Sequence, residues 1–441
     1  MSQLKKDLSL SQLTMIAIGS CIGSGIFITP ANIVAEVPNY VLALLVWAIG
    51  GFITLLGAMT FSELGARYPK AGGVYVYLKE AYGEIAGFLY GWIILLIVNT
   101  GALGALSMGL ADYLSFFFPI TGMQKTIIAI SIILGLTTIN IFGVKLSGRL
   151  AQLFTGLKLM AIAVIIVIGI SFGDVEYFHQ QLNAVNPDKG LIQAMLLALV
   201  GVFWSFGGWH HATYLSGETK EPKRTVPRAM ILGTMTVTVV YLLANIAFMN
   251  LLPGEAMATS ERVAGDALAT VFGFGGKAVA IAIIISIIGT ISIYTMTAPR
   301  IYYSMAKDGI FFQKLAELHP TFRTPYIAML FQAVWAIILL LVWGSFTKLI
   351  TFVTFMDIVF MALAAASIFI FRARAQKEEE VPFKLSWYPI IPILYVLVTV
   401  AFVFNTMISL NKESFAGIFI LLVGIPVYYF FKKKNATHKE V

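Results

Sequence analysis

The stretch IGSCIGSGIF at residues 18–27 decides how the rest of the chain is interpreted. It lies in the middle of an apolar run from Leu8 to Val37, which is long enough to cross a bilayer. A membrane-spanning helix normally bonds all of its own backbone groups, because lipid offers no partners. Gly-Ser-Gly at 23–25 weakens the helix where an interruption costs most. The pattern indicates a discontinuous helix whose opened backbone binds a polar group.

The composition is that of a protein embedded in a membrane. Of the 441 residues, 59% are hydrophobic and 12% are charged, whereas soluble domains carry roughly a quarter charged residues. Windows of about 19 apolar residues predict twelve spanning helices in one all-α transmembrane domain over residues 1–441. The predicted spans are residues 9–37, 40–66, 82–117, 124–142, 149–172, 190–216, 226–251, 277–303, 326–344, 347–371, 388–409 and 414–431.

The net charge of +8 indicates a membrane topology and not a nucleic-acid partner. With both termini in the cytoplasm, 23 of the 30 lysines and arginines fall on the cytoplasmic side and six on the outer side. This distribution follows the positive-inside rule, so we predict a multi-pass protein of the cell membrane with cytoplasmic termini. The remaining basic residue, Lys158, lies inside a span. The single cysteine, Cys21, excludes an intrachain disulfide.

The sixth predicted span has an interruption of its own. It reads FWSFGGWH at residues 203–210, with Gly207 and Gly208 near its middle. Because spans one and six begin successive groups of five helices, residues 9–172 and 190–371 would form repeats of opposite orientation, with residues 388–431 outside them. Interrupted helices at matching positions of inverted repeats point to a binding site. The alternative, that these glycines only allow close helix packing, explains one break better than two matched ones.

Four groups of residues resemble the amino acid–polyamine–organocation superfamily. They are GSGIF at 23–27, YPKAGGVYVYLKEAYG at 68–83, FWSFGGW at 203–209 with SGETKEPKRTVPRA at 216–229, and TAPRIYYSMAKDG at 297–309 with HPTFRTP at 319–325. The chain looks most like the L-amino acid transporter branch and its bacterial serine/threonine or alanine/serine/cysteine exchangers. The resemblance implies a LeuT-type five-plus-five inverted repeat with discontinuous helices 1 and 6. It also implies sodium-independent exchange of small neutral L-amino acids such as Ala, Ser, Thr and Cys by alternating access.

A break in helix 1 suits both charged groups of an amino acid. The N-terminal end of its outer half carries partial positive charge, which favours a carboxylate, and exposed carbonyl groups at the C-terminal helix ends favour an ammonium. By the resemblance, Ser24, Gly25 and Ile26 supply the amides, and Cys21 or Ile22 and residues 203–206 supply the carbonyl groups. The predicted substrate-binding residues are Cys21, Ile22, Gly23, Ser24, Gly25, Ile26, Phe203, Trp204, Ser205 and Phe206.

Trp204 matches the aromatic residue of the family's outer gate. A ring over the substrate would separate it from external water, whereas the alternative is an ordinary packing residue. His210 and His211 follow the break, and we expect them to be structural or polar packing residues.

Lys158 is about nine residues into the fifth predicted span, which at ~1.5 Å per residue places it roughly 14 Å deep. A charge at that depth is functional by default, and the alternative is a side chain that snorkels to the interface. The resemblance implies that its ammonium occupies the position of a sodium ion, bridging the carbonyl of Gly19 to helix 8 near Ser286 or Thr290. It would be either a fixed tie that supports exchange or a lysine that releases its proton and couples transport to protons.

Three further residues carry smaller predictions. Tyr241 in the seventh span matches a family tyrosine that hydrogen-bonds near helix 1, although a buried tyrosine is also ordinary. Asp357 in the tenth span could contact a substrate ammonium, take part in a gate, or pair within the bundle. Glu63 and Asp112 lie near span ends, so we expect them to be solvated.

Other classes of function lack their sequence motifs. There is no HExxH motif, Walker loop or convincing Ser/His/Asp set, so we predict no enzyme activity, no cofactor and no metal. A proton-coupled amino acid symporter and a non-transporting amino-acid sensor of the same fold stay as alternatives to exchange. Animal members of the family that this chain resembles often pair with a glycoprotein through a cysteine in the external loop between helices 3 and 4. Residues 116–124 contain no cysteine, so we expect no disulfide-linked subunit.

Overall fold

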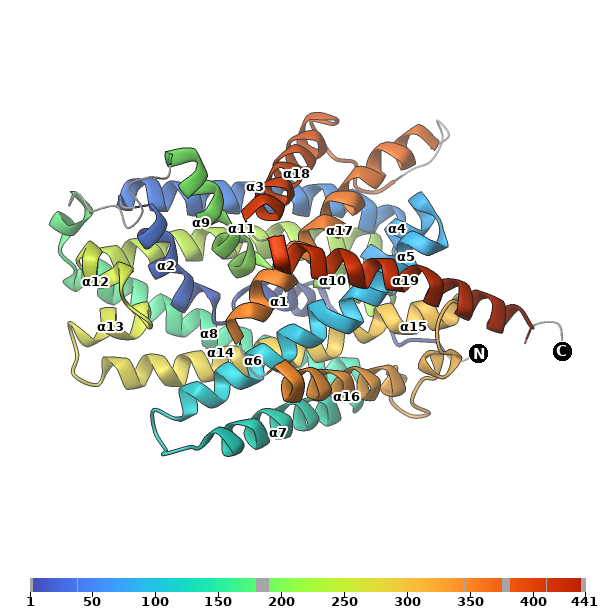
Figure 1. Cartoon of the computed structure of the whole chain (residues 1–441), viewed down its shortest axis with the longest axis horizontal. Helices are drawn as coiled ribbons and strands as arrows, with labels where there is room; N and C mark the ends of the chain where they lie inside the picture. The colour runs from blue at the N-terminus through green and yellow to red at the C-terminus, as the bar shows by residue number, and fades with distance from the viewer. Residues whose placement is uncertain are drawn as a thin grey trace.

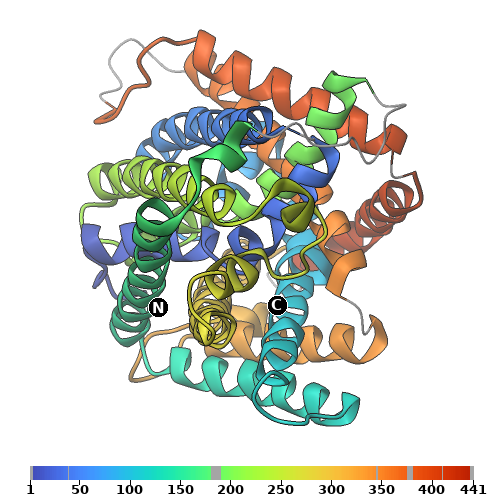
Figure 2. The ribbon, with the colours of Figure 1, turned by 90° about the vertical axis from the view of Figure 1, so that its left-hand side faces the viewer.

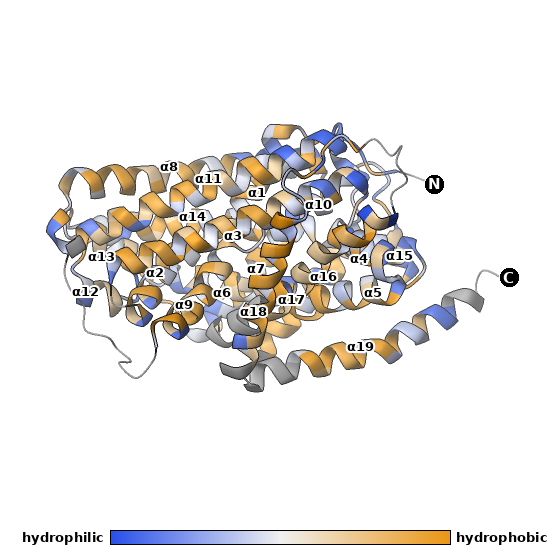
Figure 3. Cartoon of the chain, turned by 90° about the horizontal axis from the view of Figure 1, so that it is seen from above, coloured by the Kyte–Doolittle hydropathy of each residue, from blue (hydrophilic) through white to orange (hydrophobic). Residues whose placement is uncertain are grey.

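The computed structural model describes residues 3–37, 39–179, 190–343, 346–374, 381–409 and 411–437. These residues form an all-helical bundle, as predicted, in which most long helices run along the longest axis (Figure 1). Both chain ends lie at the same end of the bundle in two views (Figures 1 and 3). The short helices α12 (Gly254–Ala258) and α13 (Val263–Ala269) lie at the opposite end (Figure 1).

The other helical elements follow one another along the chain. They are α1 (Leu10–Cys21), α2 (Gly25–Glu36), α3 (Tyr40–Arg67), α4 (Val74–Tyr82), α5 (Glu84–Ile93), the π-helix η1 (Ile94–Val98), α6 (Asn99–Leu114), α7 (Gly122–Ile141), α8 (Val144–Phe172), η2 (Val175–His179), α9 (Leu191–Phe206), α10 (His211–Tyr214), η3 (Ser216–Glu218), α11 (Pro222–Leu251), α14 (Gly275–Thr297), α15 (Pro299–Lys307), η4 (Gln313–Ala316), α16 (Tyr326–Trp343), α17 (Phe346–Arg374), α18 (Ile390–Ser409) and α19 (Asn411–Thr437).

Among the described residues, nine helical segments are long and apolar enough to cross a membrane, and α1 with α2 forms a tenth, bent by 42°. Each of the twelve predicted spans overlaps a helix, but α16 and α19 are not among these ten. The number twelve therefore stays a prediction. Helices α18 and α19 lie on the outside of the bundle (Figure 2).

The surface of the bundle is suited to lipid. Helix α8 exposes Leu153, Met160, Val164 and Val167, which are each more than half exposed. Apolar residues dominate the long helices, while polar residues gather near the two ends of the bundle (Figure 3). Since such a surface would be unstable in water, it indicates a bilayer environment.

The first span is broken, as its sequence predicts. Helix α1 starts with a capping box, in which Ser9 and Gln12 bond each other's backbone groups. It ends at Cys21, and α2 starts at Gly25. Glycine is required at position 25, because a Cβ there would lie 2.7 Å from the hydroxyl oxygen of Ser205. The break therefore allows the first span to approach α9 closely.

The two broken spans run antiparallel to each other with their breaks at the same level. The hydroxyl of Ser20 donates to the carbonyl oxygen of Gly208 at 2.8 Å. Thr29 follows Ser20 in the first span, whereas Ser205 precedes Gly208 in the sixth, and the hydroxyl oxygens of Thr29 and Ser205 lie 3.2 Å apart. Gly208 has φ +98°, and a Cβ there would lie 2.9 Å from the carbonyl oxygen of Ser20. The breaks thus pack backbone to backbone in the middle of the bundle.

Candidate functional site

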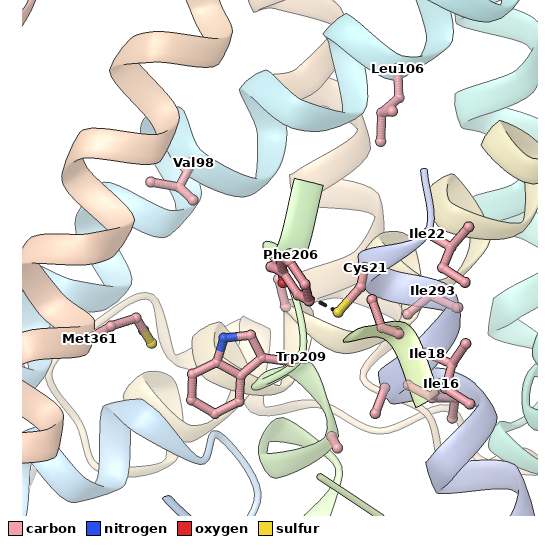
Figure 4. Close-up of a cluster of buried hydrophobic side chains, with 14 of the residues drawn as sticks. Ile16, Ile18, Cys21, Ile22, Val98, Leu106, Phe206, Trp209, Ile293 and Met361 are labelled. Carbon is pink, nitrogen blue, oxygen red and sulfur yellow. Dashed lines mark hydrogen bonds between the residues drawn. The ribbon is translucent and has the colours of Figure 1, made fainter. Parts of the chain in front are cut away.

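A cavity of about 60 Å³ lies where the two breaks meet. At roughly 10–15 Å³ for each water-sized group, it has room for about four to six such groups, which suits a small molecule. It is lined by Ser20, Cys21, Gly23, Ser24, Gly25, Ile94, Val98, Asn99, Ala102, Leu106, Phe203, Trp204, Gly207, Gly208, His210, His211, Tyr214, Thr290, Tyr294, Asp357 and Ile358. Figure 4 shows Cys21, Val98 and Leu106 around this region, with the Cys21 thiol directed to the carbonyl of Phe206.

Ser24 and Gly25 bring the N-terminus of α2 to the cavity wall. The first amides of a helix have no partner within the helix, and the helix dipole places partial positive charge there. This end of α2 therefore suits a carboxylate.

The predicted substrate-binding residues divide into two groups. Cys21, Gly23, Ser24, Gly25, Phe203 and Trp204 line the cavity. Ile22, Ile26, Ser205 and Phe206 are buried behind its wall. The carbonyl of Ile22 already accepts hydrogen bonds from three side chains, those of Lys158, Ser286 and Thr290. Since a carbonyl oxygen has two lone pairs, it has little capacity for a further donor.

Lys158 on α8 is fully buried and reaches the break. Its ammonium donates to the carbonyl of Gly19 and to the hydroxyl of Thr290, each at 3.0 Å, as well as to the carbonyl of Ile22. The hydroxyl of Thr290 lies 3.1 Å from each of the same two carbonyl oxygens and can donate its one proton to either. A single cation thus joins three elements, namely α8, the C-terminal end of α1, and α14. The structure brings these residues together as the resemblance implied.

Tyr241 on α11 makes a second connection to the break. Its hydroxyl lies 3.0 Å from the carbonyl oxygen of Cys21 and 2.9 Å from that of Ser205. A hydroxyl has one proton, so it bonds one carbonyl at a time or shares the proton between them. Trp47 and Phe206 pack against its ring. Tyr241 therefore contacts both broken spans at once.

Trp204 lines the cavity and also a larger opening beside it. A vestibule of about 780 Å³ is lined by α2, α9 and the region of α12, and Trp204 lines both it and the small cavity. Ala258 of α12 lines the vestibule, and α12 lies at the end of the bundle opposite the chain termini (Figure 1). Ser24 and Gly25 line both spaces as well, so these three residues mark where the vestibule meets the cavity.

Sequence reasoning missed the polar side of the cavity. His210 and His211, which were expected to be packing residues, line it together with Asn99 and Tyr294. His211 is held by a 2.9 Å hydrogen bond between its Nδ1 atom and Thr297. His210 Nε2 lies 3.8 Å from Asp357 Oδ1. A polar asparagine in the run ILLIVNTGALG was the available sequence signal for Asn99.

The expectation that Glu63 is solvated was wrong. Its side chain is fully buried and forms ion pairs with Arg67 at 2.9 Å and Arg372 at 2.6 Å. The backbone N–H of Leu385 donates to it as well. Residues after α17 therefore cover this end of α3. Asp112, in contrast, is exposed and pairs with Lys125.

The apolar bundle, the two broken spans and the cavity between them are typical of a membrane transport protein. A sequence model of the amino acid permease family matches residues 8–428, so the chain belongs to that family. It is 35% identical to the serine/threonine exchanger SteT of Bacillus subtilis (strain 168) over 438 residues, which cover 98% of each chain. The predicted resemblance is thus confirmed, and the protein is an amino acid transporter.

Two animal proteins are also similar to almost the whole of this chain. The large neutral amino acids transporter small subunit 2 of Homo sapiens is 32% identical over 97% of this chain and 80% of that protein. The Asc-type amino acid transporter 1 of Mus musculus is 29% identical over 97% of this chain and 81% of that protein. These relatives agree with the L-amino acid transporter branch that the sequence motifs indicated.

Proposed function

We propose that this transporter exchanges small neutral L-amino acids, such as Ala, Ser, Thr and Cys, by alternating access and without sodium. The observation that carries this proposal is the ammonium of Lys158 between Gly19 and Thr290. An ammonium at this place leaves no need for a bound sodium ion to join α1 to α14. The volume of the cavity, about 60 Å³, supports a small substrate.

The fold proposed for this function is a LeuT-type inverted repeat of twelve spans, with residues 9–172 and 190–371 as the repeats and residues 388–431 outside them. It is supported by the antiparallel contact of the two breaks, seen in the Ser20–Gly208 hydrogen bond. The peripheral position of α18 and α19 agrees with it (Figure 2).

Within this proposal, the amides of Ser24, Gly25 and Ile26 bind the substrate carboxylate, and Trp204 closes the site toward the vestibule. Cytoplasmic termini in the cell membrane place the vestibule on the external side, since it lies opposite the chain ends. Helix α1 is then held or released during the transport cycle by its contacts at five residues, namely Gly19, Lys158, Tyr241, Ser286 and Thr290. Cys21 is the single cysteine of the sequence and is buried, which supports a transporter without a disulfide-linked subunit.

Counterflow in proteoliposomes tests exchange. Purified protein is reconstituted with an unlabelled internal amino acid, and uptake of the labelled amino acid is followed with and without sodium and a pH gradient. We expect uptake that requires an internal amino acid and ignores both gradients. Uptake into empty liposomes that is driven by the pH gradient would instead establish proton symport. No flux with any of a panel of internal amino acids would favour the sensor.

A further inference from the structure

The polar wall of the cavity contains three buried acceptor atoms without a hydrogen-bond partner. They are the side-chain oxygen of Asn99, Oδ1 of Asp357 and Nδ1 of His210. All three residues line the same small cavity, and Asn99 and His210 are each 2% exposed. Buried acceptors of this kind cost free energy unless a ligand or water supplies donors. This wall is therefore built to receive a donor group.

The orientation of Asn99 is fixed by its neighbours. Its amide nitrogen donates to the side-chain oxygen of Gln332 at 3.1 Å and to the carbonyl of Tyr294 at 3.4 Å. Because a backbone carbonyl can only accept, the nitrogen must face it, and the oxygen of Asn99 stays free.

His210 and Asp357 do not satisfy each other's polar groups. The 3.8 Å between Nε2 of His210 and Oδ1 of Asp357 is too long for a direct hydrogen bond. A neutral imidazole offers one acceptor nitrogen, which is Nδ1 when the proton is on Nε2. In that tautomer, Nδ1 of His210 and Oδ1 of Asp357 are two acceptors that a ligand can fill.

Among its described residues, this wall contains one carboxyl group, that of Asp357. Among the described residues that line the cavity, Asp357 is the only carboxylate, and there is no lysine or arginine. The ammonium of Lys158 is already used by Gly19, Ile22 and Thr290. A buried carboxylate is stable only when a cation or donors compensate its lost hydration.

We propose that Asp357, His210 and Asn99 form a binding site for an ammonium group. An ammonium brings one positive charge and three donors, which matches one carboxylate and two neutral acceptors. The carbonyl of Ile22, an expected acceptor for the substrate ammonium, is occupied by side chains of α8 and α14, so Asp357 takes over that role. The inference rests on the proposed function, because it takes this cavity as the substrate site.

The bound ammonium could be the α-ammonium of the amino acid or an ammonium on its side chain, and matched ligands distinguish the two. L-alanine and L-lactate share a skeleton, but only alanine has an α-ammonium. L-2,3-diaminopropionate adds a side-chain ammonium. Binding of each to the purified full chain is measured by titration calorimetry for the wild type, D357N and H210N. D112N is the matched control, since Asp112 is an exposed acid outside the cavity.

We expect the wild type to prefer alanine over lactate, and D357N to lower the alanine affinity about 10- to 100-fold while lactate binding changes little. H210N keeps the carboxylate and should lower only the alanine affinity, by about 3- to 10-fold, which keeps the test decisive if D357N does not fold. A loss in D357N confined to diaminopropionate would support a side-chain ammonium as the occupant. D112N should match the wild type.

Two results would overturn the site. One is unchanged binding of all three ligands in D357N, and the other is an equal loss for alanine and lactate, which indicates a structural role.

Because binding in detergent does not require transport, failure of this inference is separate from failure of the proposed function. A wild type that exchanges amino acids while D357N binds them normally refutes only the ammonium site. A wild type without exchange but with the D357N effect on alanine refutes only the transport proposal.

Discussion

Replacing Lys158 by alanine tests the central contact of the proposed mechanism. The ammonium makes three hydrogen bonds, two of them to carbonyl groups at the end of α1 and one to Thr290 on α14. In Lys158→Ala, the hydroxyl of Thr290 still reaches the carbonyl groups of Gly19 and Ile22. Because one hydroxyl has one proton, Thr290 can serve Gly19 while the hydroxyl of Ser286 serves Ile22, so neither carbonyl is left without a donor and we expect the variant to fold.

The size of the effect follows from what the ammonium alone supplies. A hydrogen bond to a charged group contributes ~1.5–3 kcal/mol, so the two bonds to α1 amount to ~3–6 kcal/mol if they exist in only one conformation. The desolvation of the buried lysine offsets part of this in the folded state, so we expect the free energy of unfolding to fall by only ~1–3 kcal/mol. A change of ~3–6 kcal/mol in the free-energy difference between two conformations changes the ratio of their populations about 100-fold or more. Because each cycle of exchange passes through both conformations, the rate of exchange should fall by about 100-fold or more.

Counterflow of a labelled amino acid, normalised to the reconstituted protein, measures this loss. Lys277→Ala is the matched control, because Lys277 is an exposed lysine on α14, the helix that carries Thr290. A thermal melt of each variant separates slow exchange from unfolding. Exchange by Lys158→Ala at close to the wild-type rate would show that this lysine neither couples nor gates transport.

Three other substitutions extend the test. Tyr241→Phe removes a hydroxyl that contacts both broken spans, so it should lower the free energy of unfolding by ~1–3 kcal/mol in a denaturation experiment; an unchanged midpoint would mean that water replaces the hydroxyl. Gly208→Ala forces a Cβ into a φ of +98° and against Ser20, and should lower the melting temperature, whereas Gly190→Ala, with open space around it, should not. Trp204→Ala joins the cavity to the vestibule, so we expect the KM in counterflow to rise about tenfold; an unchanged KM would make Trp204 a packing residue.

The broken first span could be predicted because its signals are local. An apolar run, its length and a Gly-Ser-Gly at its centre are all contained in residues 8–37. The depth of Lys158 likewise follows from counting residues along one helix. Its contact with Gly19 came from a family resemblance, since nothing local brings α8 to the end of α1.

The environment of Glu63 shows what local sequence lacks. From its own span, Glu63 is an acid four residues from an arginine at a helix end, which suggests solvent. Its burial depends on Arg372 and Leu385, more than 300 residues away. Asn99 was missed for the same reason, because it shares the cavity wall with Asp357 from another span, and only the fold determines that contact.

The contacts at the first break favour exchange over one-way transport. Lys158 and Thr290 hold the C-terminal end of α1 from α8 and α14, and Tyr241 holds it from α11. None of these three donors belongs to a broken span. If α1 moves to open the site, these bonds lengthen or break, and the free energy must come from elsewhere.

A ligand shifts a conformational equilibrium only by its different affinity for the two states. Substrate bound at Ser24 and Gly25 touches the segment that joins α1 to α2, so it can supply that difference, whereas an empty cavity cannot. The empty protein would then change conformation slowly, and return across the membrane would depend on a second amino acid.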